Sequence, residues 1–163
     1  MFHTSVFNFS RVSTYLLAAL FVLANVVLPQ LFHLIPLGGL SFQPMFLLVL
    51  VAALVCGWQV ALITALASPL VNTMLFDMPT LTMLPVLLIK GGVMAFLLRW
   101  ALQSSVRLGF RLAGAVVATQ LIGVFVGWGM LGQSASLLQD FYTILPAMLL
   151  QLAVVAIKVK KVF

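Results

Sequence analysis

Long apolar segments, separated by short joins that contain polar residues, proline or glycine, run through the whole chain. A helix that crosses a membrane needs about 20 apolar residues. The pattern predicts an all-α membrane protein, a bundle of six transmembrane helices in which residues 1–163 form a single domain. The first span is clearest up to Leu28, because Pro29 and the proline and glycines beyond it predict a loop over residues 29–43. The six spans are expected at about 14–34, 41–56, 58–75, 81–98, 108–131 and 141–157.

The join at Gly57 and Trp58 leaves two alternatives, because one glycine either turns the chain or lies inside a single long helix. A turn there puts Asp77 and Asp140 on one side of the membrane and nearly all basic residues on the other. These basic residues are Arg11, Arg99, Arg107, Arg111, Lys158, Lys160 and Lys161. A merged helix would separate Arg11 from the rest, against the positive-inside rule. We therefore expect six spans, with the N and C termini in the cytoplasm.

The composition excludes a water-soluble protein, since 64% of the residues are hydrophobic and 6% are charged, and the mean hydropathy is +1.29. We expect a multi-pass protein of the cell (inner) membrane. The net charge of +6 is explained by attraction to anionic lipid headgroups, worth about 1 kcal/mol per basic residue, and does not imply nucleic-acid binding.

Enzyme chemistry is not predicted. Two acidic residues and two histidines are scattered along the chain, and Cys56 is the single cysteine, so neither a carboxylate pair nor a metal site is expected. The order Lys90-Gly-Gly is the reverse of a phosphate-binding loop. We expect no cofactor, and any uphill transport must take its energy from another subunit or an ion gradient.

Proline recurs near the expected starts of the second, fourth and sixth spans, at Pro44, Pro85 and Pro146. Proline is well tolerated in the first turn of a helix, where its missing N–H has no partner within the helix. These three residues are therefore expected in first turns.

Lys90 is the one charged residue inside an apolar segment. Burying it in a membrane costs about 2.5–3.5 kcal/mol, so it is expected to face protein or a wet cavity. Gln120 and Gln151 fall at a similar depth on the next two spans, and Gly123 and Gly127 share the face of Gln120. The glutamines alone are typical of hydrogen bonds between helices, and the glycines of close helix packing. We interpret Lys90, Gln120 and Gln151 together as a site that contacts the anionic or carbonyl-rich group of a ligand.

Other polar, aromatic and sulfur-containing side chains are candidates for closing over the same ligand. Each also has a simpler interpretation: an exposed loop histidine, a tryptophan at the membrane interface, or a methionine that fills the core. The further ligand-contacting candidates are His33, Asn72, Asp77, Met94 and Trp128, and Gln43 lies in the same outer region.

Several segments together resemble the substrate-binding S components of energy-coupling factor (ECF) transporters. They are FQPMFLLVL at 42–50, CGW at 56–58, ASPLVN at 67–72, DMP at 77–79 and PVLLIK at 85–90. The resemblance implies a six-helix subunit that binds a vitamin or vitamin-like small molecule and works with a T component and two ATPases. It also implies that the substrate lies in the outer half, against the fourth to sixth helices.

The chain departs from this family at two places. Relatives tend to carry an acid where this chain has Lys90, which implies a different substrate, one that bears a carboxylate. The family docks on its T component through small residues of the first helix, and the corresponding residues here are out of register. They are Ala18, Ala19 and Ala24.

A structural membrane scaffold, similar to the six-helix MreD-like proteins, is the main alternative function. Lys90 separates the two hypotheses, because a scaffold has no need for an unpaired charge at that depth.

Overall fold

The computed structural model describes residues 9–33, 41–103, 107–131 and 137–160. Every regular element in these ranges is a helix. They are α1 (Val12–His33), α3 (Pro44–Val55), α4 (Trp58–Phe76), α5 (Leu84–Leu102), α6 (Leu108–Leu131) and α7 (Leu137–Lys160). Five of them are long and apolar enough to cross a membrane, whereas α3 is a shorter apolar helix of 12 residues. The predicted class is therefore confirmed as an all-helical, multi-pass membrane protein, with five helices of spanning length.

The turn between the second and third segments is confirmed. Gly57 has a φ of 100°, which an L side chain rarely adopts, and it ends one helix and begins the next. The two helices that it separates, α3 and α4, pack against each other. They are therefore a pair of neighbouring helices and not one long span.

Two of the three prolines lie in first turns as predicted, Pro44 in α3 and Pro85 in α5. The prediction was wrong for Pro146, which lies inside α7. The preceding residues LLQDFYTIL contain no glycine or further proline, so the helix begins earlier, at Leu137. The predicted loop over residues 29–43 was also wrong at its start, because α1 continues through Pro29 to His33.

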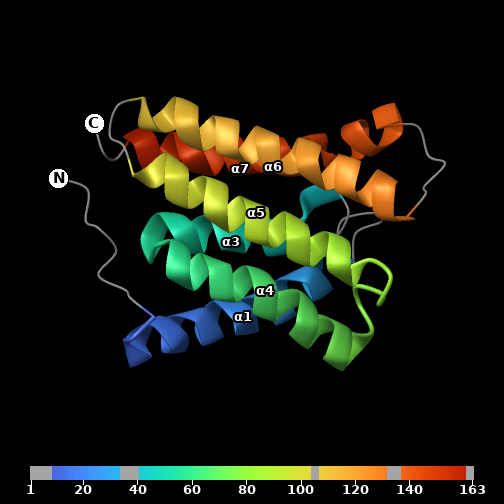
Figure 1. Ribbon diagram of the computed structural model, residues 1–163, viewed down its shortest axis with the longest axis horizontal. Coiled ribbons are helices and arrows are strands. Elements are labelled where there is room, and N and C mark those ends of the chain that lie inside the picture. Colours follow the sequence, from blue (N-terminus) through green and yellow to red (C-terminus); the bar gives the residue numbers. More distant parts are fainter. Residues whose placement is uncertain (1–8, 34–40, 104–106, 132–136, 161–163) are drawn as a thin grey trace.

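Figure 1 shows the helices lying side by side, with successive described helices running in opposite directions. α1 packs on α4, α4 on α5, α5 on α6 and α6 on α7, while α3 contacts α1, α4, α5 and α7. The short helix α3 is therefore the centre of the bundle.

This alternation brings the basic residues of α1, α5, α6 and α7 to one end of the bundle, called here the basic end (Figure 1). It carries Arg11, Arg99, Arg107, Arg111, Lys158 and Lys160. Asp77 caps the C-terminus of α4 at the opposite end. The predicted separation of charges is therefore present among the described residues, whereas Lys161 and the side chain of Asp140 lie outside them.

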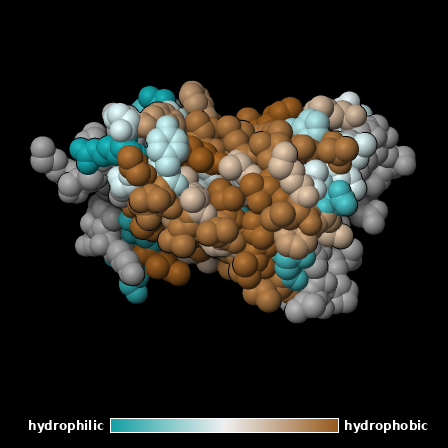
Figure 2. All heavy atoms as spheres, turned by 90° about the horizontal axis from the view of Figure 1, so that it is seen from below, coloured by the Kyte–Doolittle hydropathy of each residue, from teal (hydrophilic) through white to brown (hydrophobic). Residues whose placement is uncertain are grey.

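The face of the bundle seen in Figure 2 is largely apolar. Figure 2 shows a broad hydrophobic band between two ends that carry the hydrophilic residues. On α1, Leu16, Leu20 and Leu23 are each more than half exposed. Such a band matches the hydrocarbon layer of a membrane.

The interior is closed by aliphatic side chains and by close contacts between small residues. Leu50, Met94 and Leu98 are fully buried in the main apolar cluster. A Cβ added to Gly91 would lie 3.1 Å from both the Cβ and the carbonyl oxygen of Ala65. Glycine at this position therefore lets α5 approach the backbone of α4, and it holds the neighbouring Lys90 in the centre of the bundle.

Candidate functional site

Lys90 is buried in the middle of the protein, with a relative exposure of 5%. It lies six residues after the start of α5, about 9 Å along the helix axis. Its Nζ donates a hydrogen bond of 2.8 Å to Oε1 of Gln43 and another of 2.7 Å to Oε1 of Gln120. The ammonium group is thus held between the start of α3 and the middle of α6.

Gln120 also forms a hydrogen bond with α7. Its Nε2 donates to Oε1 of Gln151 at 3.1 Å, and both side chains are fully buried. The expected polar layer of Lys90, Gln120 and Gln151 is therefore formed, and it joins α5, α6 and α7.

The direction of these hydrogen bonds leaves one donor unused. Because Lys90 has only protons to offer, Gln120 must present its oxygen to Lys90 and its NH₂ group to Gln151. Gln151 in turn presents its oxygen, so its Nε2 points elsewhere and finds no hydrogen-bond partner among the described residues. A buried donor without a partner costs about 1–3 kcal/mol. The Gln151 amide at the end of these hydrogen bonds therefore has a buried donor that lacks an acceptor among the described residues.

Gln43 reaches the site from a strained backbone position. Its φ of 45° and ψ of 56° are left-handed, and a non-glycine residue rarely adopts them. Its carbonyl oxygen accepts hydrogen bonds from the N–H groups of Phe46 and Leu47, which places the side chain at the N-terminus of α3. Sequence reasoning placed Gln43 in the outer region but did not pair it with Lys90.

Phe46 and Gly123 complete the surroundings of the lysine. The Nζ atom lies 4.7 Å from the centre of the Phe46 ring, a distance at which an aromatic face attracts a cation. A Cβ on Gly123 would lie 2.6 Å from Cδ of Lys90, so the absence of a side chain makes room for the lysine stem. The contact of Phe46 with Lys90 was not predicted, because an aromatic residue in an apolar segment does not indicate which side chain its ring will contact.

No described carboxylate balances this charge. Asp77 is the one acidic side chain that the structure describes, and it is exposed at the C-terminus of α4. Lys90 is therefore held by two amide oxygens and a ring, all of them uncharged. Its surroundings suit a ligand group that brings a negative charge or a carbonyl oxygen.

None of the other candidates from the sequence shares a hydrogen bond with Lys90 among the described residues. Met94 lies one turn further along α5 and is fully buried in the apolar core. Asp77 is exposed, Trp128 is half-exposed on α6, and the side chain of His33 lies outside the described residues. The hydrogen bonds and the ring contact of the site come instead from Gln43, Phe46, Gln120 and Gln151.

Asn72, which was expected to close over the ligand above the Lys90 layer, belongs to a separate polar cluster with Asn25 and Ser68. Its Nδ2 donates to the carbonyl oxygens of Asn25 and Ser68, each at 2.9 Å. Pro29 lies four residues after Asn25 and has no N–H, so the Asn25 carbonyl lacks its usual partner within α1. Asn72 supplies the missing donor from α4, which explains how α1 continues through a proline.

Asn25 adds two hydrogen bonds to the same cluster through its side chain. It was not among the residues singled out from the sequence. It is fully buried, and its Nδ2 donates to Oγ of Ser68 at 3.0 Å and to the carbonyl of Met45 at 3.4 Å. The cluster thus joins α1, α3 and α4. The signal in the sequence was the spacing of four residues between Asn25 and Pro29.

Replacing Asn72 with leucine is expected to destabilise the protein by about 1–3 kcal/mol, because it leaves the Asn25 carbonyl without a donor. Thermal unfolding in detergent measures the loss. Adding Pro29→Ala restores an N–H four residues after Asn25, so the double variant should recover most of the loss. An equal loss with and without Pro29→Ala would contradict this role of Asn72.

The three alanines expected to form a docking surface do not share one environment. Ala18 has a relative exposure of 1% and packs in the apolar core. Ala19 is exposed, and Ala24 is half-buried. The prediction is corrected for Ala18, because a side chain covered by its own bundle cannot contact a partner.

Comparison of the chain with protein families, with curated proteins and with solved structures finds no match to any of them. Function is therefore inferred from the site and from the motifs in the sequence.

Proposed function

We propose that the chain is the substrate-binding S component of an ECF-type importer, which captures a vitamin or vitamin-like small molecule from outside the cell. The observation that carries the proposal is the buried Lys90. Its charge is held by uncharged groups among the described residues, and the connected Gln151 keeps an unused donor. Such a group binds a carboxylate or carbonyl oxygen without offering reaction chemistry.

The proposed orientation follows the positive-inside rule. The basic end faces the cytoplasm, both chain termini lie on that side, and the short helix α3 completes a six-helix bundle in the cell (inner) membrane. Lys90 lies nearer to the start of α5 than to its end at Leu102. In this orientation the site lies in the outer half of the membrane.

Gln43 is proposed to hold the place of the ligand in the unliganded protein. Its Oε1 occupies the position on Lys90 that a carboxylate oxygen of the ligand would take. Its strained backbone is consistent with a contact that opens when a better acceptor arrives.

The proposed partners are a T component and two ATPase subunits, because the chain contains no phosphate-binding loop. Docking on the T component would use the outward face of α1, which carries Ala19 and exposed leucines.

A scaffold function similar to that of MreD-like proteins is the second candidate. It is favoured by the fact that Gln43 and Gln120 already satisfy Lys90. In that case the polar layer only holds α3, α5, α6 and α7 together, and no small molecule is bound.

Mass spectrometry of small molecules released from the purified protein separates these two functions. We expect one small molecule with a carboxylate or several carbonyl groups, close to one per chain. In liposomes, ATP-dependent uptake of that molecule should appear when the T component and ATPases are added. Ala19→Leu should abolish uptake and leave the bound ligand in place, since the site is built from other helices.

Two outcomes would contradict the proposal. Concentrative uptake by the chain alone would favour a secondary transporter. A protein that carries no small molecule and supports no uptake with the complete module would favour the scaffold.

A further inference from the structure

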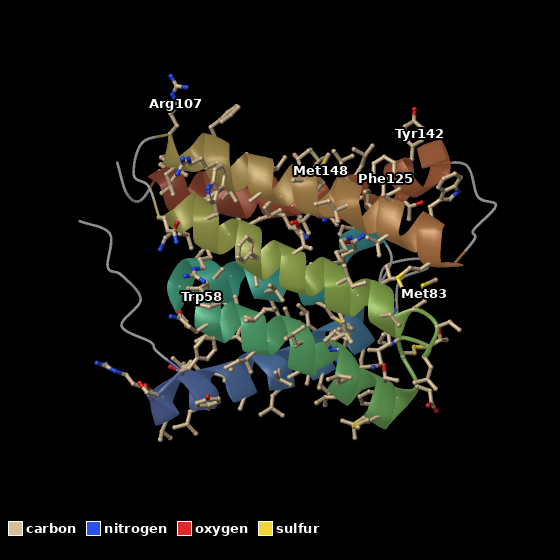
Figure 3. All side chains as sticks on the ribbon, in the orientation of Figure 1. Trp58, Met83, Arg107, Phe125, Tyr142 and Met148 are labelled. Atoms are coloured by element: carbon tan, nitrogen blue, oxygen red, sulfur yellow. The ribbon has the colours of Figure 1, made fainter. Side chains whose placement is uncertain are left out.

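The basic end carries a row of arginine and tryptophan side chains that the proposed function does not use. Cζ of Arg99, on α5, lies 4.2 Å from the ring centre of Trp58, on α4. Cζ of Arg111, on α6, lies 4.6 Å from the ring centre of Trp100, on α5. The row therefore crosses α4, α5 and α6. Figure 3 shows Trp58 at the same end of the bundle as Arg107.

Both arginines lie over an aromatic ring, and their N–H groups have no hydrogen-bond acceptor among the described residues. A guanidinium that lies over an aromatic face keeps its N–H groups free in the plane of the fork. Within the described ranges, neither Arg99 nor Arg111 donates a hydrogen bond or forms an ion pair. The described acid, Asp77, lies at the other end of the bundle. No carboxylate among the described residues therefore neutralises this row.

The surroundings of the row distinguish a lipid from a free anion. Trp100 is half-exposed, and Phe110, next to Arg111, has a relative exposure of 81%. These rings add exposed apolar surface beside the guanidinium groups at the basic end. Acyl chains cover such a surface, whereas an inorganic ion does not.

We propose that Arg99 and Arg111, oriented by Trp58 and Trp100, form a specific site for the phosphate of an anionic phospholipid at the basic end. The planar guanidinium binds phosphate oxygens in pairs, which a lysine ammonium cannot do. The site is independent of the Lys90 group and of the transport function.

Substitution of arginine by lysine tests the site, because it keeps the net charge and removes the planar guanidinium group with its paired N–H donors. The detergent-purified chain is equilibrated with equal amounts of phosphatidylglycerol and phosphatidylcholine, and native mass spectrometry counts each bound lipid. The wild type should retain phosphatidylglycerol at least tenfold over phosphatidylcholine. Arg99→Lys with Arg111→Lys should lower that preference roughly tenfold or more. Arg107→Lys, at an exposed arginine with no ring partner, is the matched control and should leave it unchanged.

Three outcomes would overturn the proposal. Equal retention of both lipids by the wild type would mean that no selective site exists. An unchanged preference in the double lysine variant would assign the attraction to diffuse positive charge, which is worth about fivefold per basic residue whatever its shape. Stabilisation by inorganic phosphate equal to that by the lipid, measured by thermal unfolding, would show an ion site that uses no acyl chain.

A second variant keeps the test decisive if the double variant unfolds. Trp100→Leu leaves every charge in place and removes only the face on which Arg111 lies. It should also lower the preference for phosphatidylglycerol, and a wild-type preference in this variant would contradict the role of the tryptophan.

Discussion

Replacing Lys90 with methionine is expected to weaken binding of the co-purified ligand roughly 10- to 150-fold. A hydrogen bond to a charged group contributes about 1.5–3 kcal/mol of binding free energy. Losing it raises the dissociation constant by about 10- to 150-fold. Equilibrium binding of the identified molecule, measured by calorimetry, gives the comparison. Lys160→Met removes the same charge at the exposed basic end and should bind as the wild type does.

The same substitution is expected to change stability little, because two effects oppose each other. Removing a charge from the membrane interior gains about 2.5–3.5 kcal/mol on insertion scales. Leaving the oxygens of Gln43 and Gln120 without their donor costs about 1–3 kcal/mol for each one that stays buried. A variant that folds normally and still binds the ligand unchanged would show that Lys90 is not part of the binding site.

Replacing Gly123 with alanine is expected to reduce ligand binding about as much as Lys90→Met does. The new methyl group would lie 2.6 Å from Cδ and 2.8 Å from Cε of Lys90, closer than carbon atoms approach each other. The lysine stem is flexible, so it moves aside and the protein still folds. Its Nζ then leaves the two glutamine oxygens, which lie 2.7 and 2.8 Å away.

Gly114→Ala is the matched control on the same helix. A Cβ at this position meets nothing within 4 Å, and alanine stabilises a helix by up to about 1 kcal/mol relative to glycine. Binding should stay at the wild-type level, and the melting temperature should rise or stay equal. If Gly123→Ala binds like Gly114→Ala, the position of Lys90 in the structure does not determine affinity.

The depth of each polar residue in the membrane was predictable from the sequence. A helix advances by a constant rise per residue, so the distance of a residue from the end of its segment gives its depth. Lys90 and Gln120 were placed by their distance from a basic residue at the segment end and Gln151 by its offset from Pro146, and the structure joins all three by hydrogen bonds. The bounds of α6 at residues 108–131 followed from the length of its apolar segment.

The partners around each helix were not predictable from the sequence, because apolar residues face both the core and the lipid. A membrane helix is hydrophobic all round, so its pattern does not indicate which face is buried. Ala18 and Ala19 look alike in the sequence, yet only Ala18 is covered. For the same reason, Asn72 was proposed only as a residue that closes over the ligand, and its hydrogen bond to the Asn25 carbonyl on α1 was not predicted.

The sequence by itself determined the helical membrane class, the gathering of basic residues at one end, and the burial of one lysine among amides. Only the tertiary structure decided that Gln43 and Phe46 hold that lysine, and that α1 runs through Pro29 with the help of Asn72. Rise per residue and charge are properties of one segment, whereas the partner of a side chain depends on how helices rotate and pack against each other.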